Sequence, residues 1–402
     1  MNSGSKLLVI NQYYAPDFAS TGQLAAELCG GLAKRGIDVH VVTGQPSYTK
    51  NSPEAPAEAI LDGVCIHRVS LGGVKGRERM RDRVNGYLRF LWGAWREARR
   101  ISESAGIKRV LTFHNPPFVG LLGSWLARKK DTKFFYVLYD IHPDVLVKTG
   151  WHLPYPILKA WDLANRAIFC KAHTLVVLGQ AMKNTVMAKG VPEEKIRILP
   201  PWGRPELEPR SKDAAIRLEL GIADDNLLLL YAGNMGVMHP LDDLLNAAAA
   251  VKDLPVQFLF LGDGVKRAKL VERLENENIQ NVTFLPYQPE DRFVRLLSAA
   301  DACLVVLEPG LEKLSMPSRA FTFLSAGKAL ITMMASDAEL VNIISEGQSG
   351  WNVKNGLELS ELIRRLSDSR DEIEERSRKA GKLYRERFSK EHLINAYANM
   401  LR

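Results

Sequence analysis

Apolar runs of strand length alternate with amphipathic stretches along the whole chain, and this alternation constrains the fold more than any other feature. The runs are apolar on both faces, as strands buried in a parallel sheet must be, and the stretches between them have the spacing of crossover helices. The 402 residues are about the length of two domains. The predicted strands are 6–10, 38–42, 64–69, 109–113, 134–139 and 174–178 in the first half, and 227–231, 256–261, 282–285, 302–307 and 330–334 in the second.

A proline-rich segment separates the two halves. Four prolines fall within 199–209, which excludes a continuous helix or a central strand there. We therefore predict an α/β fold of two doubly wound, Rossmann-like domains facing a central cleft, with the ligand at the carboxyl ends of both sheets. The predicted parts are an N-terminal domain over 1–200, a linker over 201–210, a C-terminal domain over 211–388, and a terminal helix over 389–402 that could pack back toward the first domain.

Three glycine-bearing loops follow predicted strands. Loops at this edge are where open α/β sheets bind ligands, and backbone N–H groups at a helix start attract phosphate. The spacing is not that of a dinucleotide fingerprint. For the first glycine, at the start of a predicted helix over 21–35, a role in helix packing alone is an equal alternative. The candidate nucleotide-binding residues in these loops are Gly22, Asn234, Gly236, Gly262 and Gly264.

A helix with polar residues at its start is predicted late in the chain. Pro317 and Gly327 suit its two ends. On this helix Arg319 and Thr322 share a face, because residues three apart are neighbours on a helix surface. Free N–H donors, the Ser318 hydroxyl and the Arg319 guanidinium would together hold a diphosphate without a metal ion. The alternative is that Arg319 only pairs with a surface carboxylate.

A polar cluster follows the strand predicted over 134–139. Asp140, His142 and Asp144 could act as general bases or accept hydrogen bonds from sugar hydroxyls. His114 ends its own strand and could reach the same space, although a loop histidine more often has only a structural hydrogen bond. Two aspartates and a histidine could also suggest a metal site, but no further ligand cluster is evident. We therefore expect no metal.

The basic charge is concentrated in one segment. The formal net charge is +8, and eleven basic against four acidic residues lie within 72–109. Such a surface suits an anionic membrane through 75–109, and a merely solvated face is the alternative. The segment carries a predicted helix over 84–100, whose predicted core stripe is Val84, Leu88, Leu91, Trp95 and Ala98, and whose opposite side carries Arg89, Arg96, Arg99 and Arg100, with Tyr87, Phe90 and Trp92 as interfacial aromatics.

No apolar run approaches the roughly 18–20 residues that span a bilayer, and none has the form of a signal peptide. We therefore expect a cytoplasmic protein that attaches to the inner face of the cell membrane through its basic segment. The net positive charge also raises nucleic-acid binding as a function. Because the charge is confined to one region and no recognition motif accompanies it, we expect no nucleic-acid partner.

Taken together, the motifs resemble the family-4 retaining glycosyltransferases, which have two Rossmann-like domains in the GT-B architecture. The resemblance spans nearly the whole chain and is closest to the branch that builds bacterial exopolysaccharide and antigen glycans. The matching motifs are NQYYAPD at 11–17 with TGQL at 21–24, YDIHPDV at 139–145, YAGNMG at 231–236, MPSR at 316–319 and LSAGK at 324–328.

The resemblance implies a hexosyltransferase that uses no cofactor and no metal. It would move a sugar from a nucleotide diphosphate, often UDP in this family, to a lipid-linked or polysaccharide acceptor such as a polyprenyl-diphosphate-linked glycan. A nucleotide-sugar epimerase has a similar architecture and is the alternative activity. By the same resemblance, the N-terminal domain over 1–200 binds the acceptor and the C-terminal domain over 211–388 binds the nucleotide sugar. Gly22 would then approach the donor, Asn234 and Gly236 would line the diphosphate, Ser318 and Arg319 would anchor it, and Asp140 would lie beside the reacting sugar.

Two positions depart from the family pattern. Many relatives carry two glutamates eight residues apart, the second lying five residues before the glycine matched by Gly327. Here those positions are Leu314 and Thr322. Thr322 can hydrogen-bond a ribose but cannot supply a carboxylate. Glu312, displaced by two residues, is the candidate for the first glutamate and hence for a catalytic role beside the donor sugar.

Overall fold

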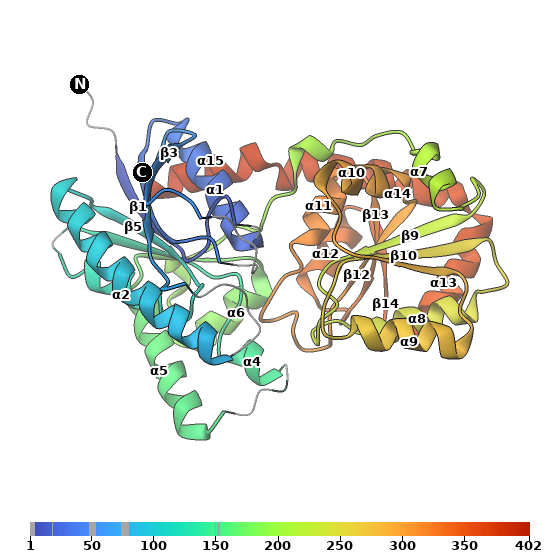
Figure 1. Ribbon diagram of the computed structural model, residues 1–402, viewed down its shortest axis with the longest axis horizontal. Helices are drawn as coiled ribbons and strands as arrows, with labels where there is room; N and C mark the ends of the chain where they lie inside the picture. Colours follow the sequence, from blue (N-terminus) through green and yellow to red (C-terminus); the bar gives the residue numbers. More distant parts are fainter. Residues whose placement is uncertain are drawn as a thin grey trace. The chain divides into compact units, whose positions relative to one another are not determined.

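The computed structural model describes residues 5–17, 19–47, 54–73, 80–129, 131–148, 150 and 153–402. The chain divides into two compact units (Figure 1). Each unit has its own largely parallel sheet covered by helices, so the predicted pair of doubly wound α/β domains is confirmed. Unit 1 comprises 1–147, 151–200 and 393–402, and unit 2 comprises 148–150 and 201–392.

The sheet of unit 1 has eight strands in the order β3-β4-β2-β1-β5-β6-β7-β8, and only β3 is antiparallel to its neighbour. All six strands predicted for this half are present. The two that were missed, β3 and β8, are short and largely exposed at the sheet edges, so they lack an apolar run. The strands are β1 (Lys6–Ile10), β2 (Asp38–Gly44), β3 (Glu58–Leu61), β4 (Val64–Val69), β5 (Arg109–Phe113), β6 (Lys133–Val137), β7 (Thr174–Val177) and β8 (Ile196–Ile198).

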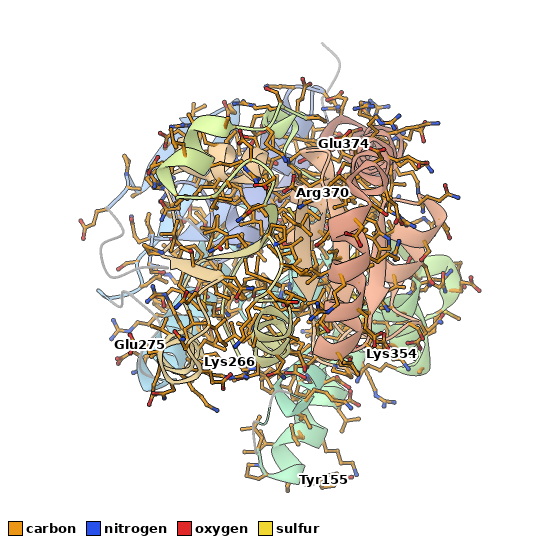
Figure 2. The ribbon with its side chains drawn as sticks, turned by 90° about the vertical axis from the view of Figure 1, so that its right-hand side faces the viewer. Tyr155, Lys266, Glu275, Lys354, Arg370 and Glu374 are labelled. Carbon is orange, nitrogen blue, oxygen red and sulfur yellow. The ribbon has the colours of Figure 1, made fainter. Side chains whose placement is uncertain are left out.

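The helices of unit 1 include one from the far end of the chain. A Cβ on Gly31 would lie 2.6 Å from the Ile394 side chain, and Arg35 donates a hydrogen bond of 2.7 Å to Asn395, so the last helix packs against α1. Tyr155, at the start of α5, is exposed and projects from the unit (Figure 2). The helices are α1 (Ser20–Ala33), α2 (Met80–Ser104), α3 (Gly120–Leu126), α4 (Asp144–Lys148), α5 (Tyr155–Lys171), α6 (Gln180–Ala188), the 3-10 turn η1 (Glu193–Lys195) and α15 (Lys390–Leu401).

Helix α2 buries only part of the predicted core stripe. Ala98 is buried and Leu91 packs against the core, as predicted, but Val84 and Leu88 are exposed. Phe90, Ala94 and Ile101, which lie outside the predicted stripe, are buried as well. A Cβ on Gly93 would lie 3.1 Å from the Val69 Cβ, which shows how closely the helix lies on the sheet. Small residues at Gly93 and Ala94 permit this approach, and Phe90 and Ile101 fill the space on either side of it.

The exposed side of α2 carries both aromatic and basic residues. Trp92 is 62% exposed, with the Arg96 guanidinium 4.8 Å from its ring centroid. Arg99 and Arg100 are also exposed, but they pair with Glu103 and Glu97. Phe90 is buried, which corrects its predicted place among the interfacial aromatics. Lys75, Arg77 and Arg79 lie outside the described residues. Within the described ranges, no helix is long and apolar enough to cross a membrane.

The sheet of unit 2 is entirely parallel, in the order β11-β10-β9-β12-β13-β14. Five of its strands were predicted. The sixth, β14, was missed because its four residues form a mixed rather than an apolar run. The strands are β9 (Leu227–Ala232), β10 (Val256–Leu261), β11 (Val282–Leu285), β12 (Ala302–Val306), β13 (Ala329–Met333) and β14 (Gly350–Val353).

The helices of unit 2 include the predicted polar-started helix, which is α11 here. Its Ala320, Phe323 and Leu324 are fully buried, as expected, and Gly327 has the positive φ of +65° that favours glycine after a helix. The helices are α7 (Ala214–Glu219), α8 (Leu241–Ala250), α9 (Arg267–Glu277), α10 (Glu290–Ala299), α11 (Arg319–Ser325), α12 (Glu339–Glu346), α13 (Gly356–Asp368) and α14 (Arg370–Leu383), with the 3-10 turn η2 (Pro205–Leu207) and the π-helical turn η3 (Tyr384–Phe388).

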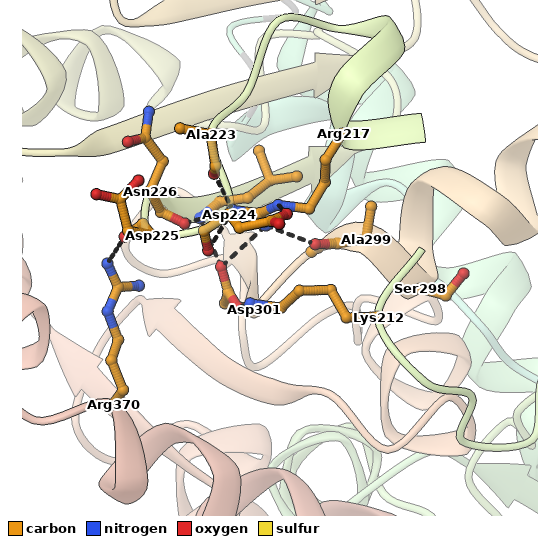
Figure 3. Close-up of polar contacts among 12 residues, drawn as sticks. Lys212, Arg217, Ala223, Asp224, Asp225, Asn226, Ser298, Ala299, Asp301 and Arg370 are labelled. Carbon is orange, nitrogen blue, oxygen red and sulfur yellow. Dashed lines mark hydrogen bonds and ion pairs between the residues drawn. The ribbon is translucent and has the colours of Figure 1, made fainter. Parts of the chain in front are cut away.

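A buried cation joins α7 to the end of α10 in unit 2. The Arg217 side chain is fully buried and donates to the carbonyl oxygens of Ala299, Ala223 and Asn226 at 3.0, 2.8 and 2.5 Å (Figure 3). It also lies 3.4 Å from the Asp301 carboxylate. We call these residues the Arg217 network. These acceptors satisfy the two terminal nitrogens of the buried guanidinium, which burial would otherwise leave without partners.

Candidate functional site

Unit 2 contains a cavity of about 160 Å³ at the carboxyl ends of β9 and β12. These two strands are neighbours, with Leu304 paired to Tyr231, and the strand order runs in opposite directions on either side of them. This is the switch point at which open α/β sheets bind ligands. The cavity is lined by Tyr231, Ala232, Gly233, Asn234, His239, Leu304, Val305, Val306, Pro317, Ser318, Arg319 and Phe323.

Arg319 brings positive charge to this cavity. It is the first residue of α11, directly after Ser318, and its side chain is half-buried. A Cβ on Gly233 would lie 3.5 Å from the Arg319 Nε and 3.4 Å from the Tyr231 hydroxyl. Burial raises the pKa of Tyr231, and the Arg319 charge opposes that shift. The cavity therefore combines a cation, a neutral phenol and a hydroxyl, a set that suits an anionic ligand.

Gly262 and Gly264 lie in the loop after β10, which packs against the loop that carries Gly233 of the cavity. Both have positive φ, and Cβ atoms on them would lie 2.0 Å from the Gly233 carbonyl oxygen and 2.5 Å from that of Met235. Glycine is therefore required for the loop after β10 to pack against the loop after β9. Neither glycine belongs to the cavity lining, so in the described chain their contacts are with the neighbouring loop.

The other predicted nucleotide-site residues of unit 2 occupy different positions. Asn234 lines the cavity, and its carbonyl accepts a 2.8 Å hydrogen bond from the Tyr231 hydroxyl. A Cβ on Gly236 would lie 2.6 Å from the Asn234 amide nitrogen. Thr322 is half-buried in α11, and Glu312 is buried, with its carboxylate accepting a 2.6 Å hydrogen bond from the Gly310 N–H. Neither Thr322 nor Glu312 is among the described cavity residues.

Gly22 allows a close approach within unit 1. A Cβ on it would lie 3.0 Å from the Tyr13 carbonyl carbon and 3.1 Å from the Tyr14 nitrogen. The start of α1 therefore lies directly against the loop that follows β1. This contact gives the glycine a role in packing, and its approach to the donor stays a prediction.

Asp140 and His114 form a pair in unit 1. The Tyr139 N–H donates to the His114 Nδ1 at 3.3 Å, so the ring proton is on Nε2, which lies 3.3 Å from the Asp140 carboxylate. His114 is buried, whereas Asp140 is one-third exposed. The histidine therefore orients a carboxylate that a ligand can reach. The pair lines a small cavity of unit 1, together with His142, Phe118 and Trp161.

Three ligand atoms of this cluster could hold a metal ion. Those of His114, Asp140 and His142 lie within 4.8 Å of one another. Both His114 nitrogens are, however, already engaged, one by the Tyr139 N–H and the other by Asp140. Asp144 is not part of the cluster, because its carboxylate pairs with Lys189 at 3.0 Å.

The sequence contained a signal for the Asp140–His114 pair. The strands β5 and β6 are parallel neighbours, so the residues that follow them meet at one edge of the sheet. His114 was considered but left out of the catalytic set. His239, which lines the cavity of unit 2, was not among the predicted site residues, because it lies three residues beyond Gly236, outside the glycine-bearing turn at Gly233–Gly236.

Comparisons with known proteins agree with this architecture. Residues 21–202 match the family described as Glycosyl transferase 4-like domain, and residues 226–369 match Glycosyl transferases group 1. The chain is 24% identical over 364 residues to WcaI of Escherichia coli K12, a glycosyl transferase named for colanic acid biosynthesis, with 82% of this chain and 84% of WcaI covered.

Two solved structures show the same fold. Sucrose-phosphate synthase from Thermosynechococcus elongatus aligns with a TM-score of 0.77 at 15% identity, over 98% of both chains. HepE from Anabaena, solved in complex with UDP and glucose, aligns with a TM-score of 0.71 at 12% identity, over 99% of both chains. With both halves matched in order and the fold shared over its length, the chain belongs to the family-4 glycosyltransferases of the GT-B architecture.

Proposed function

We propose that the chain transfers a glycosyl group from a UDP-linked sugar that binds in the cavity of unit 2. The observation that carries this proposal is the position of Arg319 and Ser318 in the lining of the cavity at the sheet's switch point, with Gly233 beside the Arg319 Nε. HepE, which has the same fold, was solved with UDP and with UDP-glucose. The diphosphate of a UDP-sugar is negatively charged, and a planar guanidinium holds phosphates by charge-assisted hydrogen bonds.

The same groups would act in the transfer step. When the sugar leaves, negative charge develops on the diphosphate, and a fixed cation stabilises that charge without reorganisation. Arg319 would supply this stabilisation without a metal ion, assisted by Ser318 and Asn234. Thr322, three residues from Arg319 on α11, would hydrogen-bond the ribose. The nucleophile would attack on the face that the diphosphate leaves, so the configuration at the anomeric carbon would be retained.

Asp140 is our candidate for the carboxylate that serves transfer rather than nucleotide binding. Its partner His114 holds it in place, and one-third of its side chain remains exposed. The acceptor would be a lipid-linked or polysaccharide glycan, as the name of WcaI suggests for that relative. A lipid-linked acceptor would place the reaction at a membrane surface, with the protein peripherally attached.

The exposed face of α2 is our candidate for that attachment. Leu88 and Trp92 are 60% and 62% exposed, and Arg89 and Arg96 are exposed on the same helix. Apolar side chains next to basic ones bind anionic lipid surfaces by partial insertion and by charge attraction. Arg99 and Arg100 contribute less positive charge to this face, because they pair with Glu103 and Glu97.

Two measurements test the proposed function. Isothermal titration with UDP and GDP should show binding to UDP, and purified protein given UDP-sugars should release UDP only when a glycan acceptor is added. Release should persist in EDTA, and NMR of the product should show the anomeric configuration of the donor. Interconversion of UDP-sugars without acceptor would instead indicate an epimerase. An absence of binding to every nucleotide tested would contradict the proposal.

Substitution of Asp140 separates transfer from binding. Asp140→Asn should lower kcat by about a hundredfold or more, the usual loss when a positioned acid–base group is removed, and should leave the Kd for UDP unchanged. Asp144→Asn is the matched control, because that carboxylate pairs with Lys189 and lies outside the cluster. Weaker UDP binding with normal kcat would remove Asp140 from the transfer step.

A further inference from the structure

His239 lines the same cavity as Arg319, although no role has been assigned to it so far. It lies in the loop between β9 and α8. Its Nδ1 lies 2.9 Å from the Val306 carbonyl oxygen. A carbonyl oxygen can only accept a hydrogen bond, so Nδ1 carries the proton and the neutral ring has a lone pair on Nε2. Of the two ring nitrogens, Nε2 is therefore the one that can interact with a ligand.

Two cations, Lys266 and Arg319, lie near enough to affect the charge of this imidazole. Lys266, at the start of α9, donates a 2.6 Å hydrogen bond to the His239 carbonyl and lies 3.7 Å from the Glu308 carboxylate. The edge of the His239 ring faces Tyr231, with ring centroids 6.2 Å apart. Burial lowers the pKa of His239, and the charges of Lys266 and Arg319 lower it further, against the effect of the Val306 hydrogen bond. Without a bound anion, the ring is therefore neutral at pH 7.

We propose that His239 is a proton-linked ligand of the donor diphosphate, taking up a proton on Nε2 when the diphosphate binds and donating it in a hydrogen bond to a phosphate oxygen. The inference rests on the proposed function, because it requires a nucleoside diphosphate in this cavity. An anion within about 4–6 Å favours the charged form of a histidine. The protonated ring donates from both nitrogens, so the hydrogen bond to Val306 is kept. The proton comes from solvent, and no covalent bond changes.

The linkage has a definite sign. If binding raises the pKa of His239, the bound state holds more protons than the free state at every pH between the two pKa values. Affinity for the diphosphate must then increase as the pH falls through that interval, by at most tenfold per pH unit. The lower limit of the interval lies below the usual histidine pKa of about 6.5, because the free ring is already shifted down.

The experiment compares UDP binding to the wild type and to His239→Gln by isothermal titration. Each would be measured near pH 6, 7 and 8 in two buffers of different ionisation enthalpy, neither containing phosphate. A glutamine amide can still donate to Val306, which keeps the loop in place, and thermal unfolding checks that both proteins are folded. The terminal phosphate of UDP itself titrates near pH 6. The readout is therefore the difference between the two proteins, in which the titration of UDP cancels.

We expect the wild type to take up more protons per UDP than His239→Gln, by up to one. Its affinity advantage should grow as the pH falls from 8 to 6, by several-fold overall. His392→Gln, a change at an exposed histidine outside the cavity, should behave as the wild type.

Two results would overturn the inference in different ways. Equal proton uptake by the wild type and His239→Gln, with parallel pH profiles, would mean that the neutral ring only accepts a hydrogen bond, from a ribose or sugar hydroxyl. That result refutes the proton linkage and leaves the proposed function standing. If the folded wild type binds no nucleotide at any pH, both the inference and the proposed function fail.

Discussion

Unit 2 holds two arginines in opposite surroundings. Arg217 is fully buried, and its guanidinium is bound by three backbone carbonyls and the Asp301 carboxylate. Arg319 is half-buried at a cavity, beside a glycine and next to residues whose pKa values its charge perturbs. The protein groups around Arg217 join three segments of the chain, whereas the space around Arg319 can admit a ligand. The same side chain therefore holds the fold together in one place and is available for binding in the other.

Both arginines carry a positive charge that is at least partly removed from water, but the cost of holding that charge differs between the two sites. A buried ion pair costs desolvation energy, and removing one partner costs about 3–5 kcal/mol because the other is left behind. A cation at a cavity costs less to maintain, since water can reach it. The two arginines should therefore respond to the same substitution through different measurements, stability for one and affinity for the other.

The largest expected effect is on stability. Arg217→Met should lower the free energy of unfolding by about 3–5 kcal/mol, because three backbone carbonyls lose their donor and the Asp301 carboxylate loses a buried cationic partner. Urea denaturation followed by circular dichroism measures this loss. UDP affinity of the remaining folded protein should be unchanged. An unfolding midpoint equal to that of the wild type would show that the Arg217 network is not structural.

The next effect is on binding. Arg319→Met should weaken UDP binding by about ten- to a hundredfold, since charge-assisted hydrogen bonds contribute about 1.5–3 kcal/mol. The urea midpoint should stay close to that of the wild type. Titration calorimetry and denaturation on the same sample provide both numbers. If Arg319→Met lost stability instead of affinity, the contrast with Arg217 would disappear.

Lys328 tests whether the contrast extends to another buried cation. Its amine donates to the Ser298 and Ala300 carbonyls at the end of α10, at 2.9 and 2.7 Å. Lys328→Met should cost about 1–3 kcal/mol of stability and no UDP affinity. Burial lowers the pKa of Lys328, so the unfolded chain binds more protons, and the wild type should gain stability as the pH rises toward about 10.4. The variant should lack that gain, and equal pH profiles would contradict this assignment.

The smallest expected effect concerns two arginines of α2 that are neither buried nor at a cavity. Replacement of Arg89 and Arg96 by Glu should weaken binding to anionic liposomes, at about 1 kcal/mol per basic residue, while UDP affinity and stability stay unchanged. Sedimentation with vesicles rich in anionic lipid, at low and high salt, measures it. Arg378→Glu, an exposed change in unit 2, is the control. Wild-type protein that stays in the supernatant at low salt would contradict membrane attachment.

Much of the fold could be predicted from the sequence because buried parallel strands are apolar on both faces. The position of Arg319 next to the cavity was also predictable, since Pro317 and Gly327 mark the ends of its helix. The buried face of α2 was predicted only in part. Apolar residues occur on more than one side of this helix, and the sequence does not show that Phe90, Ala94 and Ile101 are buried while Val84 and Leu88 are exposed. The burial of Glu312, held by a backbone N–H, depends on a turn whose geometry no residue pattern reveals.

The missed site residue, His239, and the unassigned role of His114 as the partner of Asp140 share a physical reason. His114 and His239 acquire their surroundings from strands that are distant in sequence, through the Tyr139 backbone and the Val306 carbonyl. A single sequence shows which side chains follow a strand, but not which neighbouring strand provides their hydrogen-bond partners. The sequence likewise does not show the partners of Arg217, because one of them, the Ala299 carbonyl, lies 82 residues later at the end of α10.

The packing of α15 against α1 determines when unit 1 can be completed during synthesis. A ribosome makes α15 only after all of unit 2, although its Ile394 occupies the space left by Gly31 near the start of the chain. While the chain is still being translated, the nascent unit 1 must therefore expose the apolar surface that Leu393, Ile394 and Tyr397 will later cover. A stop codon just before α15 would damage the half of the protein that was translated first.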